Sequence, residues 1–338
     1  MSLEIPGNEY RPHIAAEGAA SLVSIIIPCY KRVEYLPEAI ESALSQTYSH
    51  LEVIVVDDGS PDNTGEVVAR YPAVRYLRQA NSGVAKARNF GLESSKGEYV
   101  QFLDADDRLT TASVESHLRC FAAQPEAGFV VGDIEWVAQD NRYIGIGGWP
   151  LLEANHYEEL LKVNHVANTI AVLFRRTVLQ AVGGFEGFFS PAEDYEILLR
   201  AARSFPSAHH AAIVAQYRRH ASNTSRHGAV MLKATHRVVV AEREFVKGSP
   251  NLEAALQCGD RHWRDFFGAV TIKELYVHLC HGRFLSAAAA VTALVRFVRG
   301  RVLLLPWKYR RRGLAGIRRL LGRSKKPGAV TQAKSSPA

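Results

Sequence analysis

Apolar runs and helically spaced apolar positions alternate along the first third of the chain. Residues 23–27 and 53–56 are β-branched runs that predict strands, and between them Leu36, Ile40 and Ala43 follow a helical spacing. The alternation continues with predicted helices at 67–71 and 82–93, the second capped by Ser82, and predicted strands at 74–77 and 98–103. Near-continuous apolar strands between short helices are typical of a mostly parallel α/β sheet covered by helices on both faces.

The pattern becomes less regular after Gln124, and a mixed second half is expected. Gly183 and Gly184 follow apolar positions at 178–182 and are typical of a helix end. No internal repeat is visible. The further predicted elements are helices at 109–124, 178–182, 193–203, 252–280 and 284–298, and strands at 129–131, 134–137, 169–174 and 211–217.

Composition places the chain among ordinary globular proteins. Of its 338 residues 47% are apolar and 22% charged. Its four cysteines, at positions 29, 120, 258 and 280, have no CxxC or metal-ligand spacing, so neither a disulfide framework nor a zinc site is predicted, and a reducing cytosol fits. Because neither a leader nor a stretch of ~20 apolar residues is visible, we expect a soluble or peripheral protein.

Positive charge is concentrated near the C-terminus. Between Arg296 and Lys326 lie twelve Lys and Arg and no Asp or Glu, interleaved with aliphatic side chains and Trp307. This composition favours a helix on an anionic membrane surface over nucleic acid, because aliphatic side chains have no role on a phosphate backbone. A solvated helix packed on its own domain is an equally open alternative.

Spaced carboxylates follow the predicted strand at 98–103. Asp104-Ala105-Asp106 would present oxygen atoms to a divalent cation such as Mg²⁺, which takes one or two carboxylates and fills its remaining positions with substrate phosphates. The pattern therefore predicts a metal-bridged phosphate site. The alternative is that Asp106 or Asp107 caps the predicted helix at 109–124.

Two other strand ends should meet the same crevice, because ligands of such sheets sit beyond the carboxyl ends of the strands. Pro28-Cys29-Tyr30 ends the first strand, and Asp57-Asp58-Gly59-Ser60 ends the second, where a carboxylate could accept from a nucleobase N–H. Asn81-Ser82-Gly83 opens a helix that carries Lys86 and Arg88, a pattern suited to a diphosphate. A plain Asp-Gly turn and an ordinary capped helix are the simpler explanations.

In this order, the motifs over residues 23–107 resemble those of the inverting family-2 glycosyltransferases of the GT-A fold. The matching segments are 23–30, 45–48, 55–60, 81–91 and 104–106. The resemblance implies a GT-A catalytic domain at 22–227, with a nucleotide-binding half at 22–107 and an acceptor half at 108–227. It would be preceded by an irregular lead-in at 1–21 and followed by a helical extension with a basic amphipathic end at 228–326 and a disordered tail at 327–338.

The same resemblance assigns expected roles to single residues. Pro28, Tyr30 and Asp58 should contact the nucleoside, and Arg88 should lie near the nucleotide. Asp104 should approach the ribose, and Asp106 should hold Mg²⁺ or Mn²⁺.

The resemblance returns at Gly183-Gly184-Phe185 and Glu193-Asp194, where such enzymes carry a general base at the start of a helix. Asp194 is our candidate and Glu193 its competitor, and the base would take a proton from an acceptor hydroxyl. Acidic residues also favour a first helical turn without any catalytic role.

The segment from Tyr217 to His220 resembles the family's C-terminal flap, in which His220 would complete the metal or diphosphate site. Processive synthases of the family carry Gln-x-x-Arg-Trp. Here Gln216 and Arg219 fit that spacing, but His220 replaces the Trp, which favours transfer of a single sugar.

The expected function is therefore inverting transfer of one sugar from a nucleoside diphosphate sugar, with UDP as the default carrier, to an acceptor hydroxyl. The acceptor would be a glycan or a lipid-linked precursor in cell-surface polysaccharide or glycolipid synthesis. We expect a cytoplasmic enzyme, peripheral on the inner face of the membrane through its basic end, with no nucleic acid partner. The rivals are a sugar-nucleotide-binding protein without turnover and a nucleotidyltransferase, although the latter normally needs a Gly-rich loop that segment 28–32 lacks.

Overall fold

The computed structural model describes residues 21–147, 156–166 and 168–298. The predicted lead-in, apart from its last residue, the predicted tail and almost all of the basic segment lie outside these residues. The proposed division into a catalytic domain and a helical extension stays a prediction.

The N-terminal half is a parallel α/β unit, as the apolar runs predict. Four strands pair in the order β3-β2-β1-β4, and every residue of β1 and β4 is buried. The helix predicted at 67–71 lies a little earlier in the chain, at 64–68. The elements are β1 Val23–Cys29, α1 Leu36–Leu44, β2 Leu51–Asp57, α2 Thr64–Val68, β3 Val74–Arg78, α3 Val84–Ser94 and β4 Tyr99–Phe102.

The sheet continues past β4 with mixed pairing. Strand β8 runs antiparallel to β4, β6 antiparallel to β8, β9 parallel to β6, and β5 antiparallel to β9, while β7 pairs with β6. The α/β fold is confirmed, but the sheet is more evenly mixed than "mostly parallel", because this half lacks regular strand-helix-strand crossovers. These elements are β5 Arg108–Leu109, α4 Ser113–Ala123, β6 Phe129–Ala138, β7 Tyr143–Gly147, α5 His156–Lys162, β8 Val172–Arg175, α6 Arg176–Ala181, α7 Glu193–Ser204 and β9 Ser207–Arg219.

Two helix starts differ from the predictions. The helix expected from 109 begins at Ser113, because Arg108 and Leu109 pair with β9, so neither Asp106 nor Asp107 caps it. Helix α3 begins at Val84 after Gly83, whose φ of 90° favours glycine, and the Ser82 hydroxyl donates to the Ala80 carbonyl instead of capping the helix.

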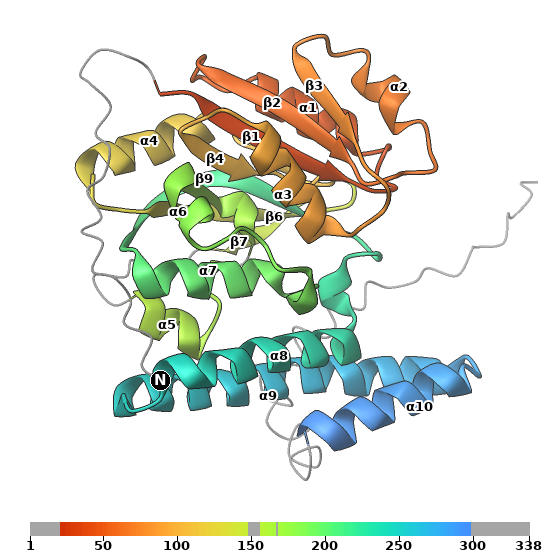
Figure 1. Ribbon diagram of the computed structural model, residues 1–338. Coiled ribbons are helices and arrows are strands. Elements are labelled where there is room, and N and C mark those ends of the chain that lie inside the picture. Colours follow the sequence, from red (N-terminus) through yellow and green to blue (C-terminus); the bar gives the residue numbers. More distant parts are fainter. Residues whose placement is uncertain (1–20, 148–155, 167, 299–338) are drawn as a thin grey trace, which may run out of the picture.

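Helices cover the sheet on both faces. Figure 1 shows α3, α6 and α7 in front of the strands and α1 behind them. The two front helices α3 and α7 come from different halves of the chain, and an ion pair between Arg88 and Glu193 joins them. Residues that are distant in sequence are thereby brought to one place.

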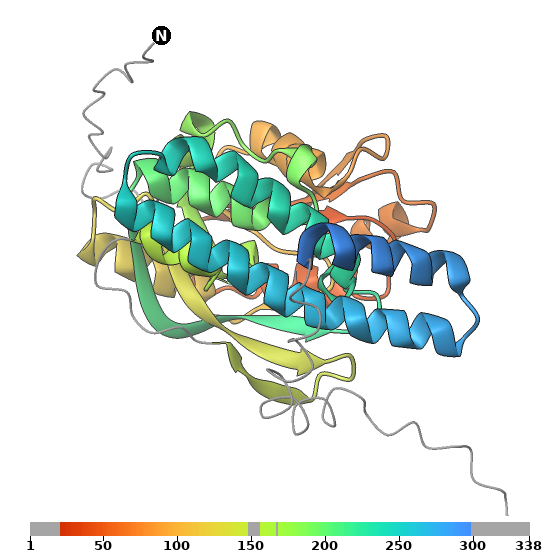
Figure 2. The same cartoon turned by 90° about the horizontal axis from the view of Figure 1, so that it is seen from below.

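A layer of helices lies beyond α7, as Figures 1 and 2 show. It comprises α8 Gly228–Val246, α9 Pro250–Cys280, α10 Phe284–Ala293 and a π-helical turn, η4, at Leu294–Val298. Val238, Val239 and Leu256 join the main core, while Met231, Phe267 and Phe297 belong to a second apolar cluster. Among the described residues, no helix combines the length and apolar character needed to cross a membrane.

Gly259 explains how α9 approaches the body of the protein. A Cβ at this position would lie 1.9 Å from the backbone oxygen of Leu161 in α5. Only a residue without a side chain permits this contact between the two helices.

Candidate functional site

The carboxyl ends of the parallel strands bring the predicted motifs to one edge of the sheet. Cys29 in β1 pairs with Asp57 in β2, and the Asp58 backbone N–H donates to the Cys29 carbonyl at 2.9 Å. On the other side of β1, the Leu103 N–H donates to the Ile26 carbonyl at 2.9 Å. The three strand-end segments therefore converge, as the sequence predicts.

Asp58 is buried and organises the loop before α3. One carboxylate oxygen accepts from the backbone N–H of Ser82 at 2.8 Å and from the Gln79 amide at 2.7 Å. The other oxygen accepts from the Gly83 N–H at 2.8 Å. Asp58 thus fixes the start of α3, and its contact with a nucleoside stays a prediction.

Asp57, which the sequence analysis gave no separate role, secures the same turn. Its carboxylate accepts from the Ser60 N–H at 2.7 Å and from the Tyr76 hydroxyl at 2.6 Å. Gly59 has a φ of 70°, and a Cβ there would lie 2.8 Å from the Asn81 nitrogen. The Asp-Gly pair is therefore a rigid turn that supports the crevice.

Pro28 and Tyr30 differ in what they can offer a ligand. Pro28 is buried within β1, whereas Tyr30 is 41% exposed at the strand end. The Lys31 ammonium lies 5.0 Å from the Tyr30 ring centroid. An exposed ring with a cation beside it suits a flat, negatively charged ligand, and the nucleoside role of both residues stays a prediction.

Arg88 forms the bridge between the two halves. It is 3% exposed, and its guanidinium contacts Asp104 Oδ1 at 2.8 Å and Glu193 Oε1 at 3.0 Å. Burial alone would lower its pKa, but the two carboxylates outweigh burial and raise it. A guanidinium presents two donors in a fixed plane, so it can hold both carboxylates at once.

Asn168 is a site residue that the sequence analysis missed. Its amide donates to Asp104 Oδ2 at 3.1 Å, so both oxygens of Asp104 have protein partners. The Asp104 side chain is still 24% exposed. No local motif marks Asn168, since its partner lies 64 residues away.

Asp106 and His220 meet, as the sequence predicts. His220 Nε2 lies 2.9 Å from Asp106 Oδ2, and Arg32 Nε donates to the same oxygen at 3.1 Å. Burial raises the Asp106 pKa, but the His220 hydrogen bond and the Arg32 charge outweigh burial, so the pKa is lowered. His220 is itself held by the Ser222 hydroxyl and by stacking on Tyr35 at 5.6 Å.

Arg218 and Asp107 hold the Asp106 and His220 segments together, and neither was predicted from the sequence to have a role in the site. The Arg218 guanidinium donates to the Asp106 backbone carbonyl at 2.9 Å and to the Glu38 carboxylate at 2.7 Å. The backbone N–H of Arg218 donates to the Asp107 carboxylate at 2.7 Å. Burial and the charges of Asp106 and Asp104 raise the Asp107 pKa. The end of β9 is thereby fixed against the Asp104-Ala105-Asp106 turn.

Gln216 and Arg219, which fit the spacing of processive synthases, turn toward β6. The Gln216 amide donates to Glu135 at 2.9 Å, and the Arg219 guanidinium lies 4.4 Å from the Trp136 ring centroid. His220 occupies the position of the missing aromatic residue and faces Asp106 instead.

The two candidate bases at the start of α7 have different surroundings. Glu193 is 5% exposed and paired with Arg88. Asp194 accepts the Tyr195 backbone N–H at 2.7 Å and, among the described residues, forms no ion pair. Burial and then the Glu193 charge raise the Asp194 pKa to about 7, against opposing effects of Arg88 and that N–H. A carboxylate that titrates near neutral pH and lacks an ion-pair partner is suited to accept a proton.

A divalent cation fits the Asp106 and His220 pair. Among the described residues, no three metal-ligating side chains form a complete cage. A carboxylate and an imidazole that converge on one point fit an ion that takes its other ligands from substrate phosphates. The donor set thus supports metal binding only together with a phosphorylated ligand.

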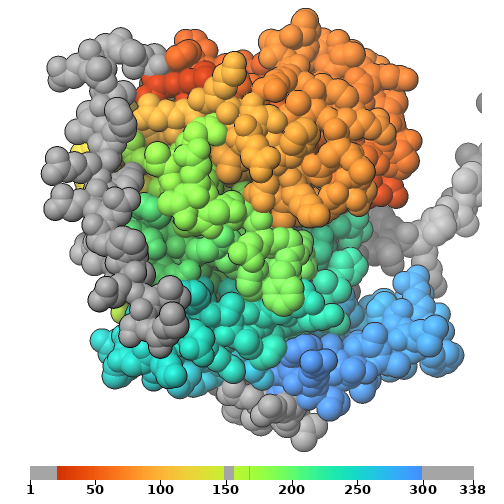
Figure 3. Space-filling model, in the orientation of Figure 1, coloured from red at the N-terminus to blue at the C-terminus, as the bar shows by residue number. Residues whose placement is uncertain are grey.

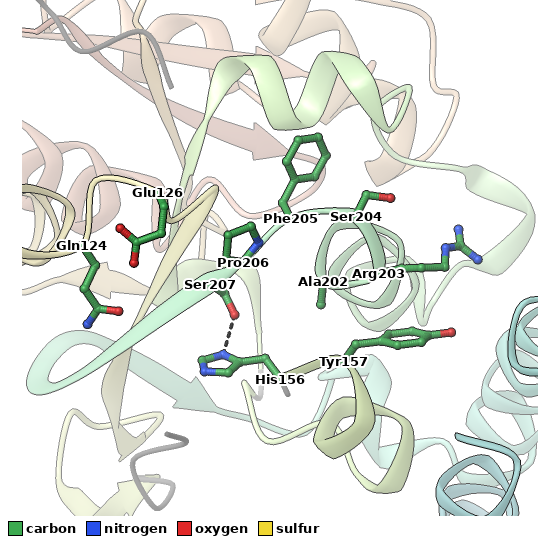
Figure 4. A pocket seen from close by; sticks show the side chains of 10 residues that line it. All are labelled: Gln124, Glu126, His156, Tyr157, Ala202, Arg203, Ser204, Phe205, Pro206 and Ser207. Atoms are coloured by element: carbon green, nitrogen blue, oxygen red, sulfur yellow. Dashed lines mark hydrogen bonds between the residues drawn. The ribbon is translucent and has the colours of Figure 1, made fainter. Parts of the chain in front are cut away.

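Figure 4 shows a separate hollow of about 480 Å³, lined by the ends of α4 and α7, by α5 and by the start of β9. His156 and Ser207 form a hydrogen bond within it. Asp194 begins α7 and Arg203 lies near its end, so this hollow lies at the opposite end of the helix from the candidate base. It is not part of the site.

Comparison with known proteins shows which family the N-terminal half of the chain resembles. The model of glycosyl transferase family 2 matches residues 24–183. The match includes the strand-end segments at 28–30, 57–60 and 104–106, while Glu193, Asp194 and His220 lie beyond it. Residues 24–183 form a glycosyltransferase family 2 domain. The resemblance predicted from the motifs is confirmed.

Relatives with assigned names include polysaccharide synthases. The chondroitin synthase of Escherichia coli is 30% identical over 226 residues, which are 65% of this chain and 32% of that protein. The hyaluronan synthase of Pasteurella multocida is 31% identical over the same share of this chain and 22% of its own length. The family-2 chain thus corresponds to a third or less of each of these synthases.

Solved structures confirm the GT-A-type fold. The mannosyltransferase PcManGT of Pyrobaculum calidifontis, in complex with GDP-Man and Mn²⁺, superimposes with a TM-score of 0.57 at 18% identity, covering 90% of this chain and 84% of that one. S. aureus TarS 1-349 in complex with UDP gives a TM-score of 0.55 at 19% identity and 71% coverage of both chains. At these identities the likeness concerns the fold alone.

Proposed function

We propose that this family-2 protein transfers a single sugar from a nucleoside diphosphate sugar to an acceptor hydroxyl with inversion. The observation that carries the proposal is the meeting of Asp104, Glu193 and the neighbouring Asp194 around Arg88, because it joins the nucleotide-binding edge to a candidate base. The family match and the fold of nucleotide-sugar-binding neighbours support it.

The mechanism follows from the roles that the residues can fill. Asp194 takes the proton of the acceptor hydroxyl while that oxygen attacks the anomeric carbon from the face opposite the leaving diphosphate. Glu193 and Arg88 hold the start of α7 against Asp104 and so position Asp194. Tyr30, Pro28 and Asp58 would define the nucleoside end of the crevice.

Asp106 and His220 would hold Mg²⁺ or Mn²⁺ together with the diphosphate. The ion supplies stabilisation of the negative charge on the leaving group. Arg32 lies on the same carboxylate oxygen of Asp106 and adds a positive charge beside this position. A neighbour of the same fold was solved with Mn²⁺ and GDP-Man, in agreement with a divalent cofactor.

Donor and acceptor are proposed at the level of chemical class. Solved neighbours bind UDP, UDP-GlcNAc and GDP-Man, and UDP is our default carrier. Since the named relatives are polysaccharide synthases, we propose a glycan or lipid-linked acceptor in cell-surface polysaccharide or glycolipid synthesis. The basic segment from Arg296 to Lys326 would then hold a cytoplasmic enzyme on the inner membrane face, without a nucleic acid partner.

The test is to incubate the protein with a panel of sugar nucleotides and Mn²⁺ or Mg²⁺ and to identify the released product. Release of a nucleoside diphosphate with one of them, lost when the metal is chelated, is the expected result. A parallel incubation with a nucleoside triphosphate and a sugar 1-phosphate tests the rival enzyme class, and release of pyrophosphate there would identify a nucleotidyltransferase. Donor binding without any release in the presence of candidate acceptors would identify a binding protein.

A further inference from the structure

The hairpin of α9 and α10 exposes large apolar side chains at its end. We define the hairpin tip as residues 276–285. Within it Tyr276 is 70% exposed, Leu279 52%, Phe284 72% and Leu285 91%. Four large apolar side chains exposed within ten residues point to an interaction site, because the surfaces of ordinary monomeric proteins keep apolar patches small.

Helix α10 is apolar on its outer side as well as its inner side. Ala287 and Ala290 are buried on the inner side, and Ala293 packs in the second apolar cluster with Met231 and Phe267. On the outer side Val291 is 44% exposed and Val295, in the following turn, 67%. The exposed side of α10 carries no charged residue, and its polar side chains are the small hydroxyls of Ser286 and Thr292. It is therefore more apolar than the solvent-facing side of a surface helix usually is.

The charged residues near the hairpin tip indicate what kind of partner would bind it. Glu274 is the last acidic side chain of the whole sequence, and fourteen Lys and Arg follow it. Arg283 lies within the tip, and Arg296 lies beside the exposed Val295. Apart from Glu274, two residues before the tip, the charged side chains within the tip and in the chain that follows it are positive. This combination of apolar and basic side chains matches an anionic lipid bilayer, whereas a second copy of the same face would bring like charges together.

The hairpin tip lies on the same side of the molecule as the candidate site. Figure 3 shows the hairpin standing out from the rest of the surface. In Figure 1 it extends to the side on which β1 ends, which is the side of the candidate site. A membrane bound at the tip would therefore lie on the crevice side of the molecule.

We propose that the hairpin tip inserts its apolar side chains into the headgroup boundary of an anionic membrane. This deepens the proposed function, on which its purpose rests, because it would bring the crevice to lipid-linked acceptors. The basic segment beyond Arg296 adds attraction to lipid phosphates, and the tip supplies the apolar contact.

The test is flotation of the full chain with vesicles of phosphatidylcholine alone or mixed with phosphatidylglycerol. The double variant Phe284→Ser with Leu285→Ser changes no charge and alters two exposed side chains. Tyr143→Ser with Ile146→Ser on β7 is the matched control, since these side chains are 55% and 56% exposed. We expect the wild type and the control to float with anionic vesicles and the tip variant to bind at least ~10-fold more weakly. Equal flotation of the tip variant and wild type overturns the proposal.

Two further measurements separate this proposal from its alternatives. Light scattering in solution gives the molar mass, and a wild-type dimer that becomes monomeric in the tip variant, with no vesicle binding by either, would make a second copy the occupant. Nucleoside diphosphate release with a water-soluble acceptor tests the proposed function alone and should be unchanged in the tip variant. Retained release without vesicle binding by the wild type overturns only the membrane proposal.

Discussion

Arg88 is placed between two carboxylates that come from distant parts of the chain. Its partners, Asp104 and Glu193, lie 16 and 105 residues away in sequence. All three side chains lose much of their contact with water when the protein folds, so each depends on the others for compensation of its charge. The ion pairs of Arg88 therefore contribute to the stability of the fold as well as to the arrangement of the site.

Replacement of Arg88 should destabilise the protein strongly. In Arg88→Ala, Glu193 would remain buried without its counter-ion, and we expect the free energy of unfolding to fall by about 3 kcal/mol. Urea denaturation measures this change. Arg119→Ala is the control, because Arg119 forms an exposed pair with Glu115 on α4 and should alter stability little. Equal stability of both variants would contradict the bridging role.

The raised pKa of Asp194 predicts how activity depends on pH. A general base must be deprotonated, and the Asp194 pKa is raised to about 7, chiefly by burial. We therefore expect kcat/KM to fall below pH 7 and to level off above it. Glu193→Gln removes the neighbouring negative charge and should move this limb to lower pH. An unchanged profile in that variant would speak against Asp194 as the titrating group.

Strand-end motifs could be predicted from sequence because they are local. The turn at Asp57 to Ser60 and the acidic motif at Asp104 to Asp106 directly follow apolar strands, and parallel strands end at the same edge. Contacts such as Asn168 with Asp104, or Arg218 with Glu38 across 180 residues, carry no local pattern. They depend on how the two halves pack, which periodicity does not specify.

In the mixed half of the sheet, some secondary-structure elements could not be predicted from the sequence pattern. The short strand β5 and strand β7, which has exposed apolar residues, lack the long apolar runs that reveal strands. Helix α4 starts four residues later than predicted because pairing of β5 with β9 takes Arg108 and Leu109 into the sheet. Tertiary pairing here outweighs helix propensity.

Gly259 offers a test of the packing between α9 and α5. In Gly259→Ala the new methyl group would meet the Leu161 carbonyl, and the two helices must separate. We expect the free energy of unfolding to fall by about 2 kcal/mol, measured by urea denaturation. Gly145→Ala on β7 is the control, since its Cβ would lie in open space. A Gly259 variant as stable as this control would contradict the observed close approach.

At the scale of the whole molecule, the chain matches only part of its polysaccharide synthase relatives. His220 replaces the aromatic residue of the processive motif and is held between Asp106 and Tyr35, and Arg219 turns away to Trp136. With excess donor we expect each acceptor to gain one sugar, as seen by mass spectrometry. A ladder of products that differ by successive sugars would show polymerisation.

The central claim is that Asp194 serves as the base of a sugar-transfer site built around Arg88. The direct measurement is Asp194→Asn, assayed for transfer and for donor affinity by calorimetry. At pH 8 the free energy of unfolding of Asp194→Asn should equal or exceed that of the wild type. The raised pKa of Asp194 means that its ionised form opposes folding, and asparagine removes that charge. We predict unchanged donor affinity and transfer reduced by roughly 10²–10⁴. Transfer at the wild-type rate would contradict the account.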